Sequence, residues 1–500
     1  MSRRADPIRP QGRRAARALS LAAVAAATLG GCSLAPTYER PALPVPGTLP
    51  GAEQGVAAAP ADLPWQEFFT DARLKQLIEA ALAHNRDLRV AILNIERARA
   101  QYGVVRADRL PTVNLSVTGS RQQPNTGNDG EGVASAYTAG LGLSAFELDF
   151  FGRVRNLSAA ALEQYLATEE ARKTTQISLI ADVAQTFLSW QAAGEQLQLA
   201  RETLATRESS WRLAKLQFDN GVASEIDLRL AESLVETART AVAQQQRAQA
   251  QAANALQQLC GMAPTSMPAA PGEPGSLYQG TEVTRPLPVG LDSSVLLRRP
   301  DVRQAEHQLI AANASIGAAR AAFFPRISLT ASGGVVSDQL DLLFKDGTRA
   351  WSFAPQLVLP IFDAGRNQAN LGIATANRDI AVAQYEGAIQ TAFREVADAL
   401  AGRATYAEQA RAQQAQAEAE AVRARLVDLR FRNGVASSLD VLDAQRSVFA
   451  AQQSAIQVRL AQRQNEIALY RALGGGWTAP AATPFMASSG APSSANAKAP

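Results

Sequence analysis

The ten residues Phe218-Asp219-Asn220-Gly221-Val222-Ala223-Ser224-Glu225-Ile226-Asp227 occur a second time in this chain of 500 residues. They return 213 positions later as Phe431-Arg432-Asn433-Gly434-Val435-Ala436-Ser437-Ser438-Leu439-Asp440, and eight of the ten positions are identical or apolar in both copies. Other landmarks recur 214 positions apart: Gly103, Arg106 and Pro111 return as Gly317, Arg320 and Pro325. Self-similarity over such a distance indicates that one structural unit has been duplicated. The function must therefore need two copies of this unit in each chain.

The repeated stretch predicts the tip of a long helical hairpin in each half. Residues 156–219 contain almost no helix breakers, and an unbroken helix of that length would extend for about 100 Å. Residues 366–432 match it in the second half. Gly221 and Gly434 are placed to end these helices. Return helices are predicted over 224–259 and 437–473, with Ser224 and Ser437 as N-caps paired to Asp227 and Asp440.

The composition of these helices is rich in Ala and Gln and poor in large apolar residues. Such helices cannot fill a thick core, so they favour close antiparallel contacts with a polar, hydrated side.

The apolar period changes from 3.6 to 2 after Pro111 and again after Pro325. Alternating runs follow at 113–117, 139–145, 327–331 and 353–359, with polar loops between them. Strands of about 10 residues can cross a bilayer when tilted, although half-buried strands of a soluble sheet show the same alternation. No apolar run of 18 residues follows Cys32, so no transmembrane helix is expected.

The N-terminus has the features of a bacterial export signal. Arg13, Arg14 and Arg17 precede a short apolar core, which ends in Leu29-Gly30-Gly31-Cys32. This ending resembles a lipobox, in which Cys32 becomes the acylated first residue; the alternative is an ordinary signal peptide with a chance cysteine. Ser33 after the cysteine indicates sorting to the outer membrane. Acylation leaves Cys260 as the one remaining thiol, which is expected to be a small buried apolar residue without a disulfide.

These features divide the chain into six segments. A signal peptide (1–31) precedes a lipidated tether (32–64), which is rich in Pro, Ala and Gly. Repeat one (65–264) and repeat two (291–477) flank a Pro- and Gly-rich linker (265–290). Each repeat is predicted to contain a helix, a β-hairpin and a long coiled-coil hairpin. The tail (478–500), rich in Ala, Ser and Pro, is predicted to be disordered.

Composition argues against several function classes. The first 32 residues carry a charge of +5, so the overall +3 becomes −2 for the remainder, and nothing favours nucleic acid as a partner. His84 and His307 do not correspond under the duplication and lack companions at metal-ligand spacing. No nucleophile elbow or phosphate-binding loop is present. We therefore expect no enzyme and no cofactor beyond a covalent lipid on Cys32.

Four strands cannot close a barrel, and an open sheet edge cannot lie in lipid. If the strands cross a membrane, copies of the chain must therefore pool them, and three copies give about 12, within the usual range for such barrels. Two hairpins from each of three copies would likewise enclose a hollow helical cylinder. The alternative is a solid, structural coiled-coil protein of the periplasm, which leaves the strands unexplained.

Several motifs resemble one known family. They are Leu296-Leu297-Arg298-Arg299-Pro300-Asp301-Val302-Arg303, Ala318-Ala319-Arg320-Ala321-Ala322-Phe323-Phe324-Pro325, Phe146-Glu147-Leu148-Asp149-Phe150-Phe151-Gly152-Arg153, Leu359-Pro360-Ile361-Phe362-Asp363-Ala364-Gly365-Arg366 and the run from Ala468 to Trp477. In combination they resemble the outer-membrane factors of tripartite efflux pumps, in the TolC-like, NodT-type lipoprotein branch. The resemblance covers roughly residues 62–477.

The resemblance implies an α+β membrane protein. It would be a homotrimer with a 12-stranded transmembrane β-barrel, four strands per chain, continuous with a long helical barrel in the periplasm. It further implies docking to a periplasmic adaptor and to a proton-driven transporter of the inner membrane. The chain would be a passive, gated exit duct for drugs or other small toxic compounds. Secretion of peptides or proteins, or efflux of heavy-metal cations, remain alternatives for the same duct.

The resemblance also assigns residues to the tips. The repeat-two hairpin would line the periplasmic constriction, with Asp440 and Asp443 facing the pore and Leu439 as an apolar ring. Asp440 has helix capping as its alternative role, whereas Asp443 replaces Leu230 of repeat one. Some family members carry a Tyr and an Arg that hold the closed state where this chain has Phe431 and Ala436, so its closure is expected to be looser or differently held. The tips would contact the adaptor through Gly221, Val222, Ala223, Ser224, Gly434, Val435, Ala436 and Ser437.

Overall fold

A computed structural model of the chain describes residues 34–49, 63–123, 133–261, 284 and 292–476. These residues form two compact units, and each unit draws on three separate stretches of the chain. The strand unit comprises the described residues within 1–44, 91–171 and 301–389, and the hairpin unit those within 45–90, 172–300 and 390–500. The predicted signal peptide, Cys32, nearly all of the linker and the tail lie outside the described residues.

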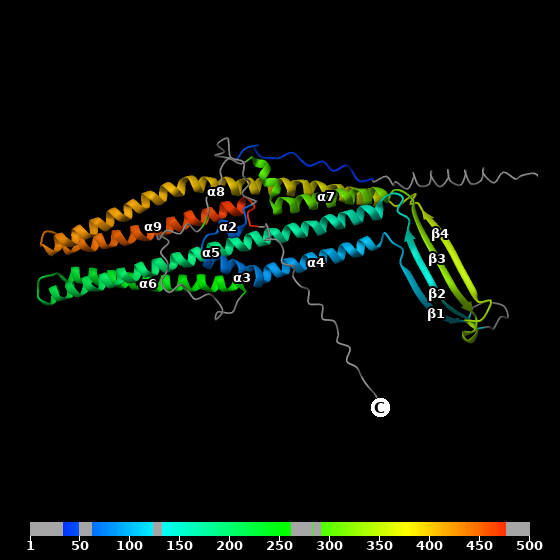
Figure 1. Ribbon diagram of the computed structural model, residues 1–500, viewed down its shortest axis with the longest axis horizontal. Coiled ribbons are helices and arrows are strands. Elements are labelled where there is room, and N and C mark those ends of the chain that lie inside the picture. The colour runs from blue at the N-terminus through cyan, green and yellow to red at the C-terminus, as the bar shows by residue number, and fades with distance from the viewer. Residues whose placement is uncertain (1–33, 50–62, 124–132, 262–283, 285–291, 477–500) are drawn as a thin grey trace, which may run out of the picture. The chain divides into compact units, whose positions relative to one another are not determined.

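The helices and strands follow the same order in both repeats (Figure 1). Repeat one consists of α2 (Trp65–Phe68), α3 (Ala72–His84), α4 (Arg86–Ala107), β1 (Val113–Gln122), β2 (Ala134–Glu147), α5 (Arg153–Asp219) and α6 (Glu225–Cys260). Repeat two consists of η3 (Ser293–Arg298), α7 (Pro300–Ala321), β3 (Arg326–Ser337), η4 (Leu340–Leu342), β4 (Arg349–Val358), α8 (Arg366–Arg432) and α9 (Ser438–Ala472). The sequence predicted each of the long helices and each of the four strands.

Several predicted boundaries differ from those of the structure, and two of these differences have a visible cause. The helix of repeat one begins at Arg153 rather than Asn156, because Gly152, in the left-handed region at φ 74°, makes the turn before it. The alternation over 353–359 ends one residue early, at Val358. Pro360 lies two residues later, and proline cannot donate to a ladder of strand hydrogen bonds.

The strands form one antiparallel sheet in the order β1-β2-β3-β4. Within each repeat the two strands form a hairpin, so that Val113 faces Leu143 and Ile327 faces Leu357. The repeats join where β2 pairs with β3, with Leu143 opposite Ala331. A bulge in β2 follows at Ser144 and Ala145. The sheet therefore has two edges in a single chain, β1 and β4, and every residue of both strands is exposed.

The core of the hairpin unit lies where α2 and α3 meet the end of α9. The rings of Phe68 and Tyr470 stack with centroids 3.9 Å apart, and Phe69 packs edge-on against both. The Tyr470 hydroxyl donates to the Leu63 carbonyl at 2.7 Å. Burial disfavours the ionised phenolate and so raises the pKa of Tyr470. Further fully buried side chains complete the core: Leu74, Ile78, Ile180, Val183, Phe187, Leu188 and Ile467.

The break between α3 and α4 is held by a buried side chain. The Asn85 Oδ1 atom accepts from the Leu88 backbone N–H at 2.9 Å, and Nδ2 donates to the Leu259 carbonyl at 2.9 Å. Cys260, next in the chain, is fully buried, as the sequence predicted, and burial raises the pKa of its thiol to about 11. A thiol that stays protonated at neutral pH is a poor nucleophile.

The two long hairpins of the hairpin unit contact each other through α9, which meets both α5 and α6. Four side-chain contacts follow α5 and α9 in antiparallel order: Ser189 with Gln464 at 3.0 Å, Glu195 with Arg459 at 3.9 Å, Arg207 over the Phe449 ring at 5.3 Å, and Ser210 with Gln445 at 3.0 Å. Phe449 packs with Ala200 and Ala241 in a small cluster, against which the half-buried Leu199 and Val242 also pack. The interface is therefore mostly polar, as the composition predicted.

No helix among the described residues combines the length and the apolar character needed to span a membrane.

Candidate functional site

The repeated decapeptide forms the tips of the two hairpins, and both tips fold by the same local interactions. The Val222 N–H donates to the Gln217 carbonyl and the Gly221 N–H to the Phe218 carbonyl; in repeat two, Val435 and Gly434 make the same two bonds to Arg430 and Phe431. This is a Schellman motif, which needs a left-handed residue at its turn. Gly221 and Gly434 supply it, with φ of 70° and 74°. Both glycines therefore end their helices, as the sequence predicted.

The asparagines of the tips have a local role that the sequence analysis missed. Asn220 Nδ2 donates to the Leu216 carbonyl at 2.6 Å, and Asn433 Nδ2 to the Leu429 carbonyl at 2.7 Å. Each of these carbonyls also accepts from the backbone N–H of the same asparagine, at 3.2 Å, so the side chain adds a second donor in the last turn of the helix. The Asn-Gly pair therefore ends each helix by itself, which explains part of its recurrence.

The serines cap the return helices as predicted. Ser224 Oγ accepts from the Asp227 N–H at 3.2 Å, and Ser437 Oγ accepts from the Asp440 N–H at 3.2 Å. In repeat two the Asp440 carboxylate also accepts from the Ser437 N–H, at 2.9 Å, which completes the capping box. These donors favour the ionised carboxylate and lower the pKa of Asp440. Capping therefore accounts for Asp440 in a single chain.

Asp443 lies in an arrangement of a different kind. Its carboxylate accepts from the Arg446 guanidinium at 2.7 Å and lies 3.7 Å from the Arg423 guanidinium of the facing helix α8. The side chain is 43 % exposed. Neither arginine was identified from the sequence, although Arg446, three residues after Asp443 on one helix, could have been. Leu439 lies one turn before Asp443, on the same side of α9, and is 58 % exposed.

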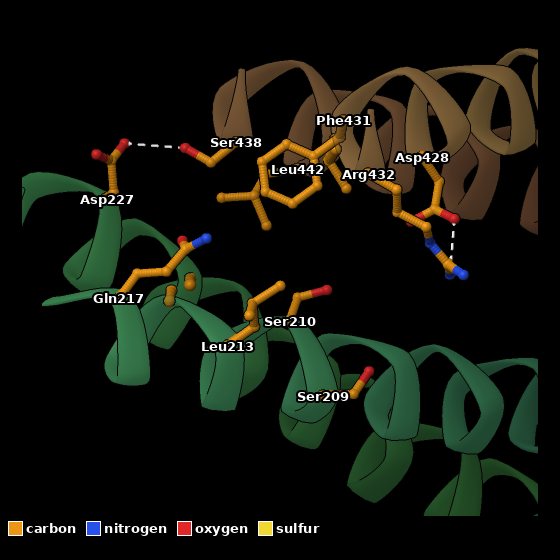
Figure 2. Close-up of a pocket in the computed structure, with 13 residues that line it drawn as sticks. Ser209, Ser210, Leu213, Gln217, Asp227, Asp428, Phe431, Arg432, Ser438 and Leu442 are labelled. Atoms are coloured by element: carbon orange, nitrogen blue, oxygen red, sulfur yellow. Dashed lines mark hydrogen bonds and ion pairs between the residues drawn. The ribbon is translucent and has the colours of Figure 1, made fainter. Parts of the chain in front are cut away.

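A groove of about 310 Å³ separates the hairpins just behind the tips (Figure 2). Phe431 projects from α8 into this groove beside Leu442, toward Leu213 on α5. At the end nearest the tips, Ser438 Oγ donates to Asp227 Oδ1 at 3.3 Å. Arg432 pairs with Asp428 at 2.8 Å within α8. Gln445 Nε2 also donates to Ser210 Oγ, at 3.0 Å, on the wall of the groove. The two hairpins are thus joined near the tips by these two hydrogen bonds, with the Phe431 ring in the groove between them.

The structure places the other predicted tip residues on the surface. Val222 is 78 % exposed and Val435 is 64 % exposed. Ala223 and Ala436 lie between these valines and the capping serines. None of these side chains is needed to close the turn, since the backbone bonds and the capping serines do so. Exposed apolar residues on a preformed turn are suited to contact with another protein.

The charged side chains of the tips are held by caps and ion pairs. Among the described residues, no group of three or more His, Cys, Asp or Glu side chains is arranged to hold a metal ion. The two carboxylates near the tip of repeat two are bound to a serine and to arginines. Such a tip can contact a partner or present charge to a passage.

Comparison with known proteins gives consistent matches over both repeats. Residues 77–262 and 291–475 match the model of a family described as outer membrane efflux protein. The chain is 48 % identical over 467 residues to the antibiotic efflux pump outer membrane protein ArpC and to the toluene efflux pump outer membrane protein TtgC, both of Pseudomonas putida, covering 92 % of this chain and 95 % of theirs. A crystal structure of the open state of the Neisseria gonorrhoeae MtrE outer membrane channel is 41 % identical, with a TM-score of 0.81 over 89 % of this chain and 99 % of that one.

The groove makes a prediction about the tips. Replacing Phe431 by Ala should loosen the hairpins at their ends, because a half-buried aromatic side chain contributes about 1–2 kcal/mol through its apolar contacts. Ser438→Ala should act in the same direction but more weakly, by roughly 0.5–1 kcal/mol. Spin labels on Val222→Cys and Val435→Cys would report a longer and broader distance distribution.

Phe218 supplies a matched control. It is the repeat-one counterpart of Phe431, is 38 % exposed and does not line the groove. Phe218→Ala should leave the distance between the labels unchanged. Equal shifts in both alanine variants would show that general softening of the helix ends, and not the groove, controls the distance.

Proposed function

The chain belongs to the outer membrane efflux protein family, and we propose that it is the exit duct through which an efflux pump releases small toxic compounds across the outer membrane. The match of the family model to both repeats is the observation that carries this proposal. It confirms the family predicted from the sequence motifs. The names of ArpC and TtgC indicate antibiotics and aromatic solvents as the class of compound exported.

The duct is proposed to be a homotrimer whose sheets combine into one 12-stranded barrel. The support is the pair of edge strands: among the described strands, none pairs with the outer side of β1 or of β4, and such edges cannot face lipid. Pairing β4 of one copy with β1 of the next would satisfy both edges. Three copies supply about 12 strands, which is a common size for such barrels.

The duplication specifies the register of that pairing. Val113 corresponds to Ile327, and their partners Leu143 and Leu357 correspond likewise, each pair 214 positions apart. Inside the chain, Leu143 of β2 lies opposite Ala331 of β3. The repeat counterpart of Leu143 is Leu357, and that of Ala331 is Val117. In the barrel, Leu357 of one copy would therefore lie opposite Val117 of the next. The contact between copies would thus repeat the contact between β2 and β3.

Helix α8 supports the same arrangement. Ala160 and Ala167 of α5 are both 5 % exposed, whereas their counterparts 213 positions later, Ile373 and Ile380, are 60 % and 54 % exposed. On α8, which is uncovered here in a single chain, isoleucines thus replace the buried alanines of α5. An exposed apolar stripe of this kind indicates a surface that another protein covers.

The helix that covers α5 inside the chain identifies what would cover α8. His307 of α7 lies 2.7 Å from Glu163 of α5. The counterparts of this polar pair are Leu93 of α4 and Ala376 of α8, and Leu93 is 51 % exposed. We therefore infer that α4 of one copy packs on α8 of the next. The polar pair within the chain becomes an apolar contact between copies, where burial must drive association.

The periplasmic end is assigned to the hairpin tips. The proposed adaptor contact consists of Gly221, Val222, Ala223, Ser224, Gly434, Val435, Ala436 and Ser437. The proposed constriction consists of Leu439, Asp440 and Asp443. An inner-membrane, proton-driven transporter is proposed as the source of energy, and acylation of Cys32 as the lipid anchor.

The arginines beside Asp443 modify the expected charge of the constriction. Each Asp443 carboxylate is paired with Arg446 and approached by Arg423. In a three-fold ring, three carboxylates would meet three to six guanidinium groups. Cation preference would therefore depend on the balance between these acids and bases, and it would be screened within about 8–10 Å if the ring were wide.

Recording of single channels in planar bilayers tests the duct and its ring together. The protein should conduct and favour cations, and multivalent cations should block it. Asp440→Asn and Asp443→Asn should reduce both properties, whereas Arg446→Gln should strengthen them because it frees a carboxylate. Asp219→Asn, at the tip of repeat one, is the control. A protein that gives no conductance would support a structural coiled coil, and unchanged selectivity in both Asp variants would remove these residues from the gate.

Disulfide trapping tests the register. Directly opposite Cα atoms in an antiparallel pair lie about 4.5–5.5 Å apart, within the range of a disulfide. Val117→Cys with Leu357→Cys should therefore cross-link copies into a covalent trimer. Val113→Cys with Leu357→Cys is the control, since the two positions would lie about 13 Å apart. Cross-linking of the control pair alone would show that the register is shifted; buried Cys260 should not interfere.

The tips make a prediction about partner contact. Val222→Trp and Val435→Trp should abolish resistance to the exported compounds in a strain that depends on this chain, because the bulky ring prevents docking of the adaptor. The oligomer should still assemble, since neither side chain is buried. Val422→Trp, several turns behind the tip on α8 and 48 % exposed, is the control. Full resistance in both tip variants would contradict the assignment.

A further inference from the structure

Residues 34–40, just after the proposed lipidated cysteine, lie along one side of α7 in the strand unit. Their contacts run in antiparallel order to the helix. The Arg320 guanidinium donates to the Leu34 carbonyl at 3.2 Å, and Asn313 Nδ2 donates to the Pro36 carbonyl at 2.7 Å. Further along, Tyr38 and Arg40 both reach Glu306. We name residues 34–40 the strap.

Glu306 is the strongest point of this contact. Its carboxylate accepts from the Tyr38 hydroxyl at 3.0 Å and from two nitrogens of Arg40, at 2.7 and 3.1 Å. The residue is 8 % exposed, whereas the Arg40 side chain is 53 % exposed. Burial and the bond to Glu306 raise the pKa of Tyr38. A buried carboxylate held by three charge-assisted bonds fixes the strap at one position on the helix.

Gly317 provides the second fixed point. A Cβ atom at this position would lie 2.5 Å from Asn156 Nδ2 of α5, 2.7 Å from the Ala35 nitrogen and 2.8 Å from the Ala35 Cα. The strap therefore passes directly over the helix backbone, and a side chain here must displace both the strap and the Asn156 amide. Gly103, the counterpart in repeat one, would meet nothing within 4 Å.

The polar contacts of the strap are specific to repeat two. Glu306 corresponds to Ile92 and Asn313 to Arg99, each 214 positions earlier. Ile92 can accept no hydrogen bond, and Arg99 carries a charge where Asn313 carries an amide. The duplicated unit thus diverged at two of the four positions that hold the strap, whereas Gly317 and Arg320 keep the residues of Gly103 and Arg106. This divergence argues that the contact has a role of its own.

We propose that this face of α7 is a docking site for the strap and that it fixes the height at which the lipidated N-terminus enters the membrane. Arg320 lies six residues before the first residue of β3, and Leu34 lies two residues after Cys32. Two residues span at most ~7 Å, so a docked strap holds the anchor beside the start of the strand. The docked strap is already extended, because the six residues from Leu34 to Arg40 span about 21 Å, the rise of the 14 helical residues from Glu306 to Arg320. Release would therefore free Cys32 from the start of the strand without lengthening the connection.

The consequence concerns assembly. Lipid chains insert into the membrane before the strands pair, and a short connection keeps the strands at a high effective concentration near the bilayer surface. Docking therefore couples anchoring to insertion of the sheet. The inference rests on the proposed acylation of Cys32 and on the proposed placement of the strands in the outer membrane.

Glu-C protease measures docking directly, because cleavage after Glu39 separates the peptide 32–39 from the rest of the chain. The full-length protein would be digested in vesicles of phosphatidylethanolamine and phosphatidylglycerol. Arg40→Gln and Glu306→Gln should be cleaved about tenfold faster than the parent, since each removes a charge-assisted bond. Gly317→Ala should behave likewise. Gly387→Ala, at a helical glycine with open space around it, should be cleaved at the parent rate.

The mass of the released peptide separates this inference from the proposal on which it rests. A peptide without acyl chains would refute the anchor, whatever the cleavage rates. With acylation confirmed, equal cleavage of all variants would show that Glu306 and Gly317 do not hold the strap. Arg40→Gln alters only the exposed strap, so it remains informative if Glu306→Gln does not fold.

The rate of oligomer formation in the same vesicles tests the consequence. Acylated variants with a released strap should form the detergent-resistant oligomer several-fold more slowly than Gly387→Ala. Rapid cleavage with an unchanged assembly rate would refute the coupling of docking to insertion.

Discussion

The backbone of two edge strands determines most of what this chain must do. β1 and β4 each present a row of N–H and C=O groups that no other described strand of the same chain pairs with. In water such groups would bind solvent, but hydrocarbon offers no partner, and each unpaired group costs several kcal/mol. The proposed outer-membrane sheet therefore requires neighbouring copies. Closure of the proposed barrel is also compatible with the duplication. β4 is the repeat counterpart of β2 and β1 that of β3, so pairing β4 of one copy with β1 of the next would repeat the β2–β3 pairing found within the chain.

The two repeats diverge most where their neighbours differ. The interface of α5 with α7 forms within one chain, where the linker keeps the partners together, and it contains the polar pair of His307 and Glu163. Its proposed counterpart between copies has Leu93 and Ala376 instead. Association between separate molecules must overcome a loss of translational freedom, and apolar burial supplies the required free energy. Likewise, only the second repeat carries Glu306, because only its helix α7 receives the strap.

Elements set by local interactions were predicted well from the sequence. The Gly turns, the capping serines and the alternating strands depend on residues within a few positions of one another, and the structure contains all of them. The motifs likewise identified the family correctly. Contacts between distant segments were missed: Ser438 with Asp227, Arg423 with Asp443, and Glu306 with the strap. Their partners lie 20 to 268 positions apart, and no periodicity or cap links them in the sequence.

The missed contacts explain how the tips can be held without the family's tyrosine and arginine. Phe431 keeps the aromatic ring of the tyrosine but has no hydroxyl, so it can fill the groove beside Leu442 and cannot form a directional bond. The Ser438–Asp227 bond supplies direction, but at 3.3 Å and close to solvent it contributes little free energy. The other contacts between α5 and α9 are also mostly polar and can exchange with water at small cost. In the proposed duct, contacts this weak would let the tips open when the proposed adaptor binds them, since binding need supply only a small difference in free energy between the two states.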